Sequence, residues 1–368
     1  MSKLGPNPKL RNLSRGYKEA RGDLIWILDC NIWVRRETCR RMVDLLLGQS
    51  NDPSKRLPAK LVHQLPIAVV IDPATQMVAE PALTAGLPNI EGAHVECMFL
   101  STSHAQFYTA INAVAISPCL VGKSNMFRRS HLESLTNRDP SRSSGIDFFS
   151  WHICEDHMIG DLLWRQPVPE ALRVKAIGAT AWTNHALLRG YPAFQPLCRM
   201  SIQQYKNRRA RWLTARKWTV TLATAIEPGT EAFMCSLIGA TGMAFQLGSI
   251  SPAGRLMSTG LLWLASIAAW AAVDWWLSGM LSEATLPAGM QPVSRPRGIA
   301  RWLRTWTMRE GLALPIWLQG VCFSNTVRWR GTNFKVGPDM KARIVGGEGA
   351  GEADYRSYEA RRQGDKAE

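Results

Sequence analysis

Two carboxylate settings in the sequence could carry chemistry, one at the end of a predicted strand and one at the start of a predicted helix. Asp29 directly follows an unbroken apolar run, residues 24–28. Such a run is typical of a strand buried on both faces, as in a parallel sheet, where ligands bind beyond the carboxyl ends of the strands. A carboxylate there suits a divalent cation on a diphosphate, with Asn31 as a weaker, neutral ligand. The alternative is that Asp29 only caps a helix or turns the chain.

The second carboxylate setting is the pair Glu155-Asp156, which precedes a helical pattern of apolar residues. A carboxylate at a helix start can take the proton of a bound hydroxyl, so Asp156 is the candidate general base. Glu155 is expected to line the same site. His157 follows the pair and is expected to pack behind it rather than to take part.

A basic segment lies at residues 206–217, where six Lys or Arg residues and no acidic residue occur. It contains Arg208-Arg209-Ala210-Arg211-Trp212, which fits the pattern (Q/R)xxRW. The planar guanidinium of Arg211 could meet a diphosphate. Trp212 could pack beside the sugar or acceptor, or anchor the segment at a membrane surface.

The composition narrows the class of partner. A net charge of +15 predicts an anionic partner such as a nucleotide, a phosphate or an acidic lipid. Neither zinc-finger spacing nor a helix-turn-helix pattern occurs, so nucleic acid is not expected. The eight cysteines form no CxxC pair, which argues against a zinc site and a disulfide framework. Gly122-Lys123-Ser124 is not a P-loop, because position 117 is Ser instead of the first glycine of that motif.

The first 205 residues read as an α/β domain, and the rest of the chain does not. Helices are expected at 14–21, 35–47 and 95–115, strands at 24–28, 60–70 and 174–177, and an inserted surface loop at 72–94. Residues 206–217 form the basic interfacial helix, and residues 218–330 form a membrane region. The tail, 331–368, is expected to be flexible.

Three hydrophobic segments, 232–250, 256–281 and 311–327, suggest the membrane region. A spanning helix needs about 20 apolar residues, so the first two qualify and the third, broken by Pro315, is marginal. Asp274 near one end of the second segment is expected to snorkel or to pair with a neighbouring helix. Basic residues between the second and third segments place the soluble part in the cytosol. A large helical soluble domain is the alternative.

Taken together and in this order, these features resemble membrane-bound glycosyltransferases of the GT-A fold, and most specifically the ceramide glucosyltransferase family of fungal type. The resemblance covers most of positions 3 to 335. It is carried by Asn7-Pro8-Lys9, Gly16-Tyr17, Asp23-Leu24-Ile25-Trp26-Ile27, Leu61-Val62-His63-Gln64-Leu65-Pro66, Thr102-Ser103-His104, Glu155-Asp156 and Arg211-Trp212.

The resemblance implies a GT-A-like (Rossmann-like) α/β domain followed by transmembrane helices. It implies inverting transfer of glucose from UDP-glucose to ceramide, with Mg or Mn as the cofactor. The implied site comprises Asp156 as base, Asp29 and Asn31 at the metal, and Arg208, Arg211, Trp212, Glu155, His104, Lys9 and Asn12 at the substrates. It also implies a Golgi or endomembrane protein whose catalytic domain faces the cytosol beside the lipid bilayer.

The start of the chain suggests a truncation. A βαβ unit takes roughly 30 residues or more, and only 23 precede the strand at Leu24. We therefore expect the N-terminal anchor and the first nucleotide-binding part to be missing. On this reading the chain as written binds UDP-glucose weakly or not at all and has no measurable ceramide glucosylation. A polysaccharide-extending glycosyltransferase and a non-catalytic membrane relative remain as alternatives.

Overall fold

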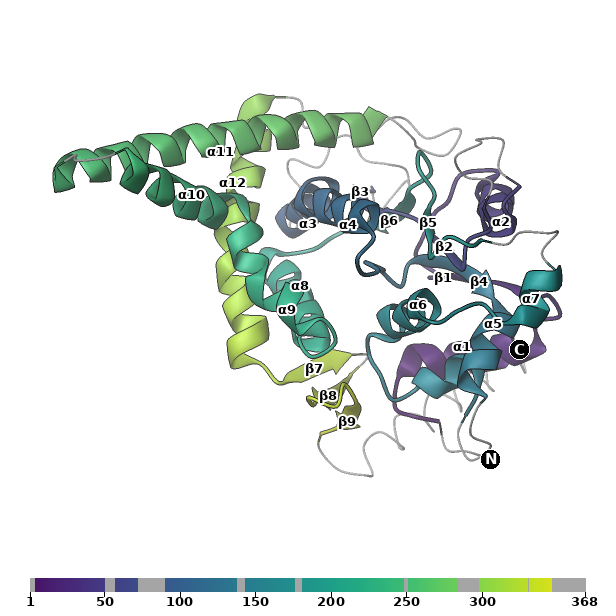
Figure 1. Ribbon diagram of the computed structural model, residues 1–368. Coiled ribbons are helices and arrows are strands. Elements are labelled where there is room, and N and C mark those ends of the chain that lie inside the picture. Colours follow the sequence, from purple (N-terminus) through teal and green to yellow (C-terminus); the bar gives the residue numbers. More distant parts are fainter. Residues whose placement is uncertain are drawn as a thin grey trace.

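The computed structural model describes residues 4–49, 57–71, 90–137, 143–175, 181–247, 251–283, 298–329 and 331–345. An α/β part carries one end of a long helical hairpin (Figure 1). The elements of the α/β part are α1 (Pro8–Glu19), β1 (Leu24–Leu28), α2 (Thr38–Leu47), β2 (Leu61–His63), β3 (Pro66–Val70), α3 (Glu91–Ser101), α4 (Ser103–Val114), β4 (Ser124–Arg128), α5 (Arg129–Thr136), η2 (Gly145–Phe149), α6 (Glu155–Arg165), α7 (Glu170–Lys175), β5 (Ala186–Leu187), β6 (Ala193–Leu197) and α8 (Ile202–Arg216). The remaining elements are α9 (Thr221–Ile226), η3 (Glu227–Thr230), α10 (Ala232–Gln246), α11 (Pro252–Glu283), α12 (Ile299–Trp317), η4 (Leu318–Phe323), β7 (Thr326–Trp329), β8 (Thr332–Val336) and β9 (Ala342–Ile344).

The main sheet has the strand order β1-β4-β2-β5 and is mixed. The prediction that β1 is a parallel strand buried on both faces is wrong. It pairs antiparallel with β4, from Leu24 opposite Arg128 to Leu28 opposite Ser124, and all five of its residues are only partly buried. As the last strand of the described sheet, β1 has a single neighbour. Its apolar residues pack on helices of either face, which explains the unbroken apolar run.

Two predicted elements are each divided in two. The predicted strand at 60–70 forms β2 and β3, which belong to different sheets; β3 pairs in parallel with β6. The strand does not continue through Gln64. The side-chain amide of this residue donates to the carbonyl of Tyr191 and accepts from the Ser124 hydroxyl. The predicted helix at 95–115 breaks at Thr102, whose hydroxyl donates to the carbonyl of Met98 at 2.6 Å.

Three other predictions, a strand, an inserted loop and a flexible tail, have different outcomes. The predicted strand at 174–177 is wrong where it is described, because α7 extends to Lys175. Most of the predicted insertion, 72–94, lies outside the described residues, and its last residues begin α3. The start of the predicted flexible tail is ordered: β8 and β9 pair antiparallel with each other, and Ala342 donates to the carbonyl of Trp151.

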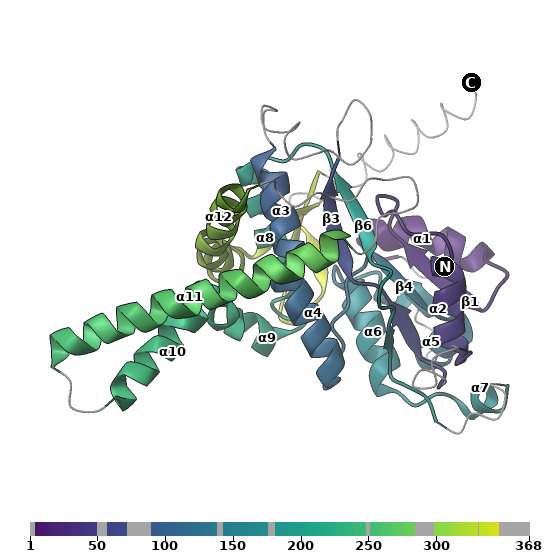
Figure 2. The ribbon, with the colours of Figure 1, turned by 90° about the horizontal axis from the view of Figure 1, so that it is seen from above.

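Helices α10 and α11 form a hairpin that projects from the rest of the molecule in both views (Figures 1 and 2). By length and composition α11 is the one described helix able to cross a membrane, over Pro252–Ser282, and α10 is a shorter apolar helix. Asp274 of α11 pairs with Arg309 of α12 at 3.0 Å. Of the two expectations for Asp274, this confirms pairing with a neighbouring helix. The predicted third segment is divided: α12 ends at Trp317, one π-helical turn follows, and β7 begins at Thr326.

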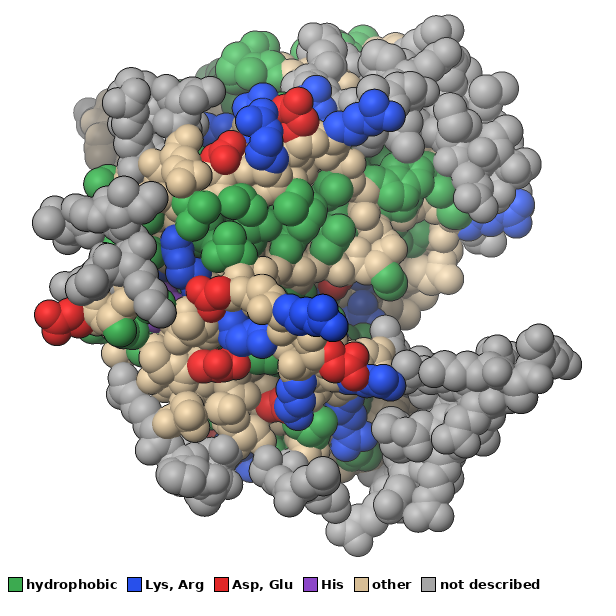
Figure 3. Space-filling model, turned by 90° about the vertical axis from the view of Figure 1, so that its right-hand side faces the viewer, with side chains coloured by type: hydrophobic (Ala, Val, Ile, Leu, Met, Phe, Trp, Pro, Cys, Tyr) green, Lys and Arg blue, Asp and Glu red, His purple; other side chains and the backbone are tan. Residues whose placement is uncertain are grey.

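Charge on the α/β part is of mixed sign. On the face shown in Figure 3, Lys and Arg side chains lie beside Asp and Glu side chains. Where that face is described, the net charge of +15 therefore does not form one continuous basic surface. Cations that could bind a phosphate are therefore individual side chains near the sheet.

Candidate active site

Asp29 lies at the end of β1, where two ammonium groups hold its carboxylate. Lys9 Nζ is 3.2 Å from Asp29 Oδ1, and Lys123 Nζ is 3.0 Å from Asp29 Oδ2. The Asp29 backbone N–H donates to the carbonyl of Lys123, which fixes the loop before β4 beside the end of β1. The strand end thus carries two cations around one carboxylate.

Helix α1 aims Lys9 at this point because Asn7 fixes its first turn. The Asn7 side-chain oxygen accepts the backbone N–H groups of Lys9 and Leu10, an N-cap that satisfies two otherwise free donors. The Asn7 amide also donates to Glu155 Oε2 at 2.9 Å. Asn12, on the same helix, is exposed, and no hydrogen bond of its side chain to a described residue is found. The structure therefore gathers Lys9 but not Asn12.

Glu155 and Asp156 form the first turn of α6, as predicted. Lys9 Nζ lies 3.1 Å from Glu155 Oε1 and donates to the carbonyl of Gly122 at 2.8 Å. Burial raises the pKa of both carboxyls, and Lys9 opposes the shift. The backbone N–H of Gly122 donates to Asp156. Asp156 is thus a desolvated carboxylate with an elevated pKa, which is the state a general base needs.

The basic segment forms α8, which begins at Ser201 with a reciprocal capping box to Gln204. Helix α8 packs against α3 with six of its residues buried, and its position at a membrane surface stays a prediction. Arg208 pairs with Glu96 at 2.9 Å and donates to Gln195 Oε1 at 3.0 Å.

Arg208 belongs to the same electrostatic site as Asp29. Burial lowers the pKa of Lys123; Asp29 opposes this shift, and Arg208 adds to it. Two cations, Lys9 and Lys123, therefore hold Asp29 at the end of β1, and Arg208 of α8 lies near enough to Lys123 to affect its pKa. A diphosphate carries the charge that such a group would bind.

Arg211 and Trp212 are half-buried on α8. Burial and then Arg208 lower the pKa of Arg211, and no ion pair of its guanidinium with a described residue is found. The Trp212 ring lies 4.8 Å from the Arg208 guanidinium carbon and packs against the core beside α3. Arg208 and Trp212 thus contact each other, whereas Arg211 is left without a counter-ion in the described part of the chain.

His104 lies near the start of α4 and stacks on Tyr108, with 5.5 Å between the ring centroids. Its Nδ1 is buried without a hydrogen-bond partner in the described structure. Burial, aided by Arg209 and Arg216, lowers its pKa to about 3, so the ring is neutral near pH 7. Burial also lowers the pKa of His157.

The residues for a metal are few. Asn31 is exposed, and no hydrogen bond of its side chain to a described residue is found. Among the described residues no group of three or more His, Cys, Asp or Glu side chains could hold a metal ion. Asp29 is nevertheless partly accessible, and Mg²⁺ commonly uses one or two carboxylates plus substrate phosphates. The donor set therefore fits a metal that arrives with a nucleotide, not a cage built by the protein.

Sequence reasoning missed Asn7, Gly122 and Lys123 as site residues. Asn7 was recognised only as part of a similar stretch, although an Asn before a Pro-started helix is an N-cap signal. In the sequence, Gly122 and Lys123 stand out only as part of Gly122-Lys123-Ser124, which is not a P-loop. A Cβ at Gly122 would lie 2.6 Å from Lys9 Nζ, so the glycine makes room for the lysine.

Comparison with known proteins shows the family of the chain. The family model of glycosyl transferase family 21 matches residues 1–69 and 56–342. Ceramide glucosyltransferase of Pyricularia oryzae is 42% identical, over 94% of this chain and 70% of that protein. Those of Gibberella zeae and Komagataella phaffii are 38% and 30% identical, over 90% and 92% of this chain and 69% of each protein. No solved structure gives a significant match.

Proposed function

Since the chain belongs to glycosyl transferase family 21, we propose that it transfers glucose from UDP-glucose to the primary hydroxyl of ceramide with inversion, giving glucosylceramide. The observation that carries this proposal is the partly buried Asp156 carboxylate, with its raised pKa, next to the cations at the end of β1. The cations Lys9, Lys123 and Arg208 suit the departing diphosphate. Asp156 suits the incoming hydroxyl.

Each group has a distinct part in this reaction. Asp156 accepts the proton of the ceramide hydroxyl as its oxygen attacks the anomeric carbon, and the bond to the UDP oxygen breaks. Lys9 and Lys123 stabilise the charge that develops on the diphosphate. Arg211, which lacks a counter-ion among the described residues, adds a planar donor. Glu155 holds Lys9 in position at 3.1 Å.

A divalent ion is also part of the proposal. Asp29 would be its protein ligand once the diphosphate supplies further oxygens. Bound there, the ion would add Lewis-acid charge at the leaving group. The prediction is that chelation weakens UDP binding and that Asp29→Asn abolishes this sensitivity.

The family and the long apolar helix α11 indicate a membrane-associated protein. We place it in the Golgi or endomembrane system with the α/β part facing the cytosol, where UDP-glucose is soluble and ceramide stays in the bilayer. A GT-A-like fold fits the mixed sheet with catalytic carboxylates at its edge.

The test is a transfer assay with the whole chain in lipid nanodiscs, UDP-glucose and a fluorescent ceramide. Formation of glucosylceramide that Asp156→Asn abolishes is the expected result. UDP binding without any transfer would favour the non-catalytic relative. Elongation of an oligosaccharide acceptor instead would favour the polysaccharide-extending alternative.

A further inference from the structure

A cavity of about 300 Å³ lies where the α/β part meets the apolar helices. Its walls come from α3, α8, η3, α10 and α12, and most of the side chains that line it are apolar, among them Phe99, Leu213, Phe233, Met234, Leu314 and Trp317. Asp156 is not among the described residues that line it. The cavity is therefore a second place, separate from the base, and its walls suit an apolar group.

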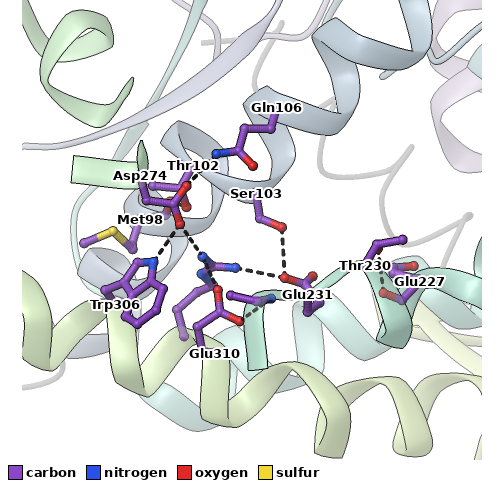
Figure 4. Close-up of polar contacts among 12 residues, drawn as sticks. Met98, Thr102, Ser103, Gln106, Glu227, Thr230, Glu231, Asp274, Trp306 and Glu310 are labelled. Atoms are coloured by element: carbon purple, nitrogen blue, oxygen red, sulfur yellow. Dashed lines mark hydrogen bonds and ion pairs between the residues drawn. The ribbon is translucent and has the colours of Figure 1, made fainter. Parts of the chain in front are cut away.

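The charged residues that line the cavity already have counter-ions in the protein. Arg209 lies 3.8 Å from Glu227. Arg309 pairs with Glu231 at 2.9 Å and with Glu310 at 2.5 Å. Figure 4 shows Glu231 and Glu310 meeting at the same guanidinium. Because these charges neutralise one another, the surface left for a ligand is the apolar one.

One wall of the cavity belongs to the apolar hairpin. Phe233 and Met234 lie in the first turn of α10 and line the cavity. Leu237 and Ile238, in the next turn of the same helix, are 41% and 60% exposed. Lipid around the hairpin would therefore lie about one helical turn from the cavity. An apolar group inside the cavity could continue from there into the bilayer.

Another wall leads toward Asp156. Glu227 lines the cavity and pairs with Arg216 at the end of α8. Burial raises the pKa of the Cys119 thiol to about 11. Three charges also act on this pKa, those of Arg216, Asp156 and Glu227. Since charges shift a pKa over short distances, the wall at Glu227 and the base at Asp156 both lie near one thiol.

Ring contacts give a second measure of the same separation. The ring of Phe99, which lines the cavity, lies 5.6 Å from that of His104, and His104 lies 5.5 Å from Tyr108. Burial raises the pKa of Tyr108, and the charges of Cys119 and Asp156 raise it further. Two ring contacts and one electrostatic interaction thus separate the cavity from the base. A lipid chain spans about 15 Å, half of the hydrocarbon core of a bilayer, which suits this distance.

We propose that the cavity binds one hydrocarbon chain of the acceptor lipid while the head of that lipid lies at Asp156. The reacting hydroxyl meets the base, the chain passes the pair of Arg216 and Glu227, and its methylenes fill the space between α8, α10 and α12. Burial of methylenes is favourable whatever the chemistry of the head. The cavity therefore selects acceptors by the length of a chain. This inference rests on the proposed function, because it names where one chain of that acceptor lies.

Photolabelling locates the chains and the head separately. The whole protein in phosphatidylcholine nanodiscs is exposed to ceramides that carry a diazirine in the middle of the base chain, in the middle of the acyl chain or beside the amide. We expect at least one chain probe to label residues 232–234 and 311–317, and unlabelled ceramide to remove these labels. The amide probe should label other residues.

Three outcomes of this experiment would overturn the inference. Neither chain probe labels these residues; the amide probe labels them as strongly as a chain probe does; or a phosphatidylcholine with a diazirine in its chain labels them and unlabelled ceramide does not displace it. The last outcome would assign the cavity to any bilayer lipid. Labelling does not need turnover, so absence of transfer would count against the proposed function and leave the chain labels readable.

A matched pair of variants tests selection by chain length. A Cβ at Gly311, which lines the cavity, meets no heavy atom within 4 Å, and neither does one at Gly239 of α10, which is not among the described residues that line it. Gly311→Leu therefore narrows the cavity without a backbone clash. It should raise the KM for long-chain ceramide about tenfold and weaken the chain labels. The KM for UDP-glucose, and that for a ceramide analogue with only a few carbons in each chain, should stay unchanged.

Gly239→Leu is the control and should change none of these values. An equal rise in KM for the long-chain and short-chain acceptors in Gly311→Leu would show a general disturbance of the site instead of selection by chain length. Unchanged KM for long-chain ceramide together with unchanged chain labels would equally contradict the inference.

Discussion

At the residue scale, Asp156 is marked by its position at the start of α6, where the Gly122 backbone N–H donates to it and desolvation raises its pKa. Asp156→Asn keeps the size and the Gly122 contact but cannot take a proton, so turnover should fall by about 10²–10⁴-fold. UDP binding, measured by calorimetry, should be nearly unchanged. Asp161→Asn is the control, because that carboxylate lies on the same helix and pairs only with Arg165 on the surface. Near-normal turnover of Asp156→Asn would end the assignment.

The pH profile reports on Lys9. Burial raises the pKa of Asp156, and Lys9 lowers it. The active form is the carboxylate, so kcat/KM should fall as the pH drops through this elevated pKa. Lys9→Met removes the opposing charge, so the pKa rises further and the acid limb should move to higher pH. Lys18→Met removes a lysine from the same helix that pairs with Asp147 and should leave the limb in place. A limb that stays, or moves to lower pH, contradicts the model of the site.

Carboxylates at element ends pointed to Asp29 and to the pair Glu155-Asp156, and the resemblance added Arg208. The structure brings Asp29 and Glu155 together on Lys9, and the catalytic roles of these residues stay predictions. Lys123 could not be predicted in the same way. It reaches Asp29 only because β4 pairs antiparallel with β1, a contact across 94 residues of chain. Asn12 is the opposite case. It lies close to Lys9 in the sequence and was expected at the substrates, but its side chain is exposed to solvent.

At the scale of elements, Arg309 joins α12 to α11 and to the residues before α10. Arg309→Met would leave three buried carboxylates without their cation, which typically costs about 3–5 kcal/mol. The midpoint of thermal unfolding in detergent should therefore fall by roughly 5–10 °C. Arg304→Met, on the exposed side of the same helix, should have almost no effect. Equal midpoints for the two variants would show that the network does not hold these helices together.

The elements themselves were partly predictable. Helical periodicity located α2 and α6, the basic segment located α8, and apolar length located α10 and α11. Strand direction was not predictable, because an apolar run such as β1 reads the same whether its neighbour is parallel or antiparallel. The break at Thr102 depends on one hydroxyl bonding a carbonyl four residues back, which the periodicity of the surrounding residues does not reveal.

At the scale of the whole molecule, the apolar surface is concentrated on the projecting hairpin. Large side chains such as Ile238 on α10 and Leu256 on α11 are 60% and 76% exposed. Monomeric soluble proteins rarely expose contiguous apolar patches of this kind, so lipid is the expected covering. Such an arrangement would hold the α/β part beside the bilayer, where an acceptor lipid is available.

The hairpin gives the last prediction. Leu261 and Leu264 lie in the middle of α11 and are 62% and 59% exposed, so Leu261→Glu with Leu264→Glu should not disturb the protein core. If α11 lies in lipid, each charge costs about 2.5–3.5 kcal/mol there. The whole chain should resist alkaline carbonate extraction, and the double variant should appear largely in the supernatant.

Ile116→Glu is the matched control, because Ile116 is 82% exposed but lies after α4, away from the hairpin. It should stay in the membrane pellet like the unmodified chain. If the double variant also stayed in the pellet, α11 would not be the element that holds the protein in the bilayer. If the unmodified chain were extracted, the apolar hairpin would have to be covered by protein instead of lipid.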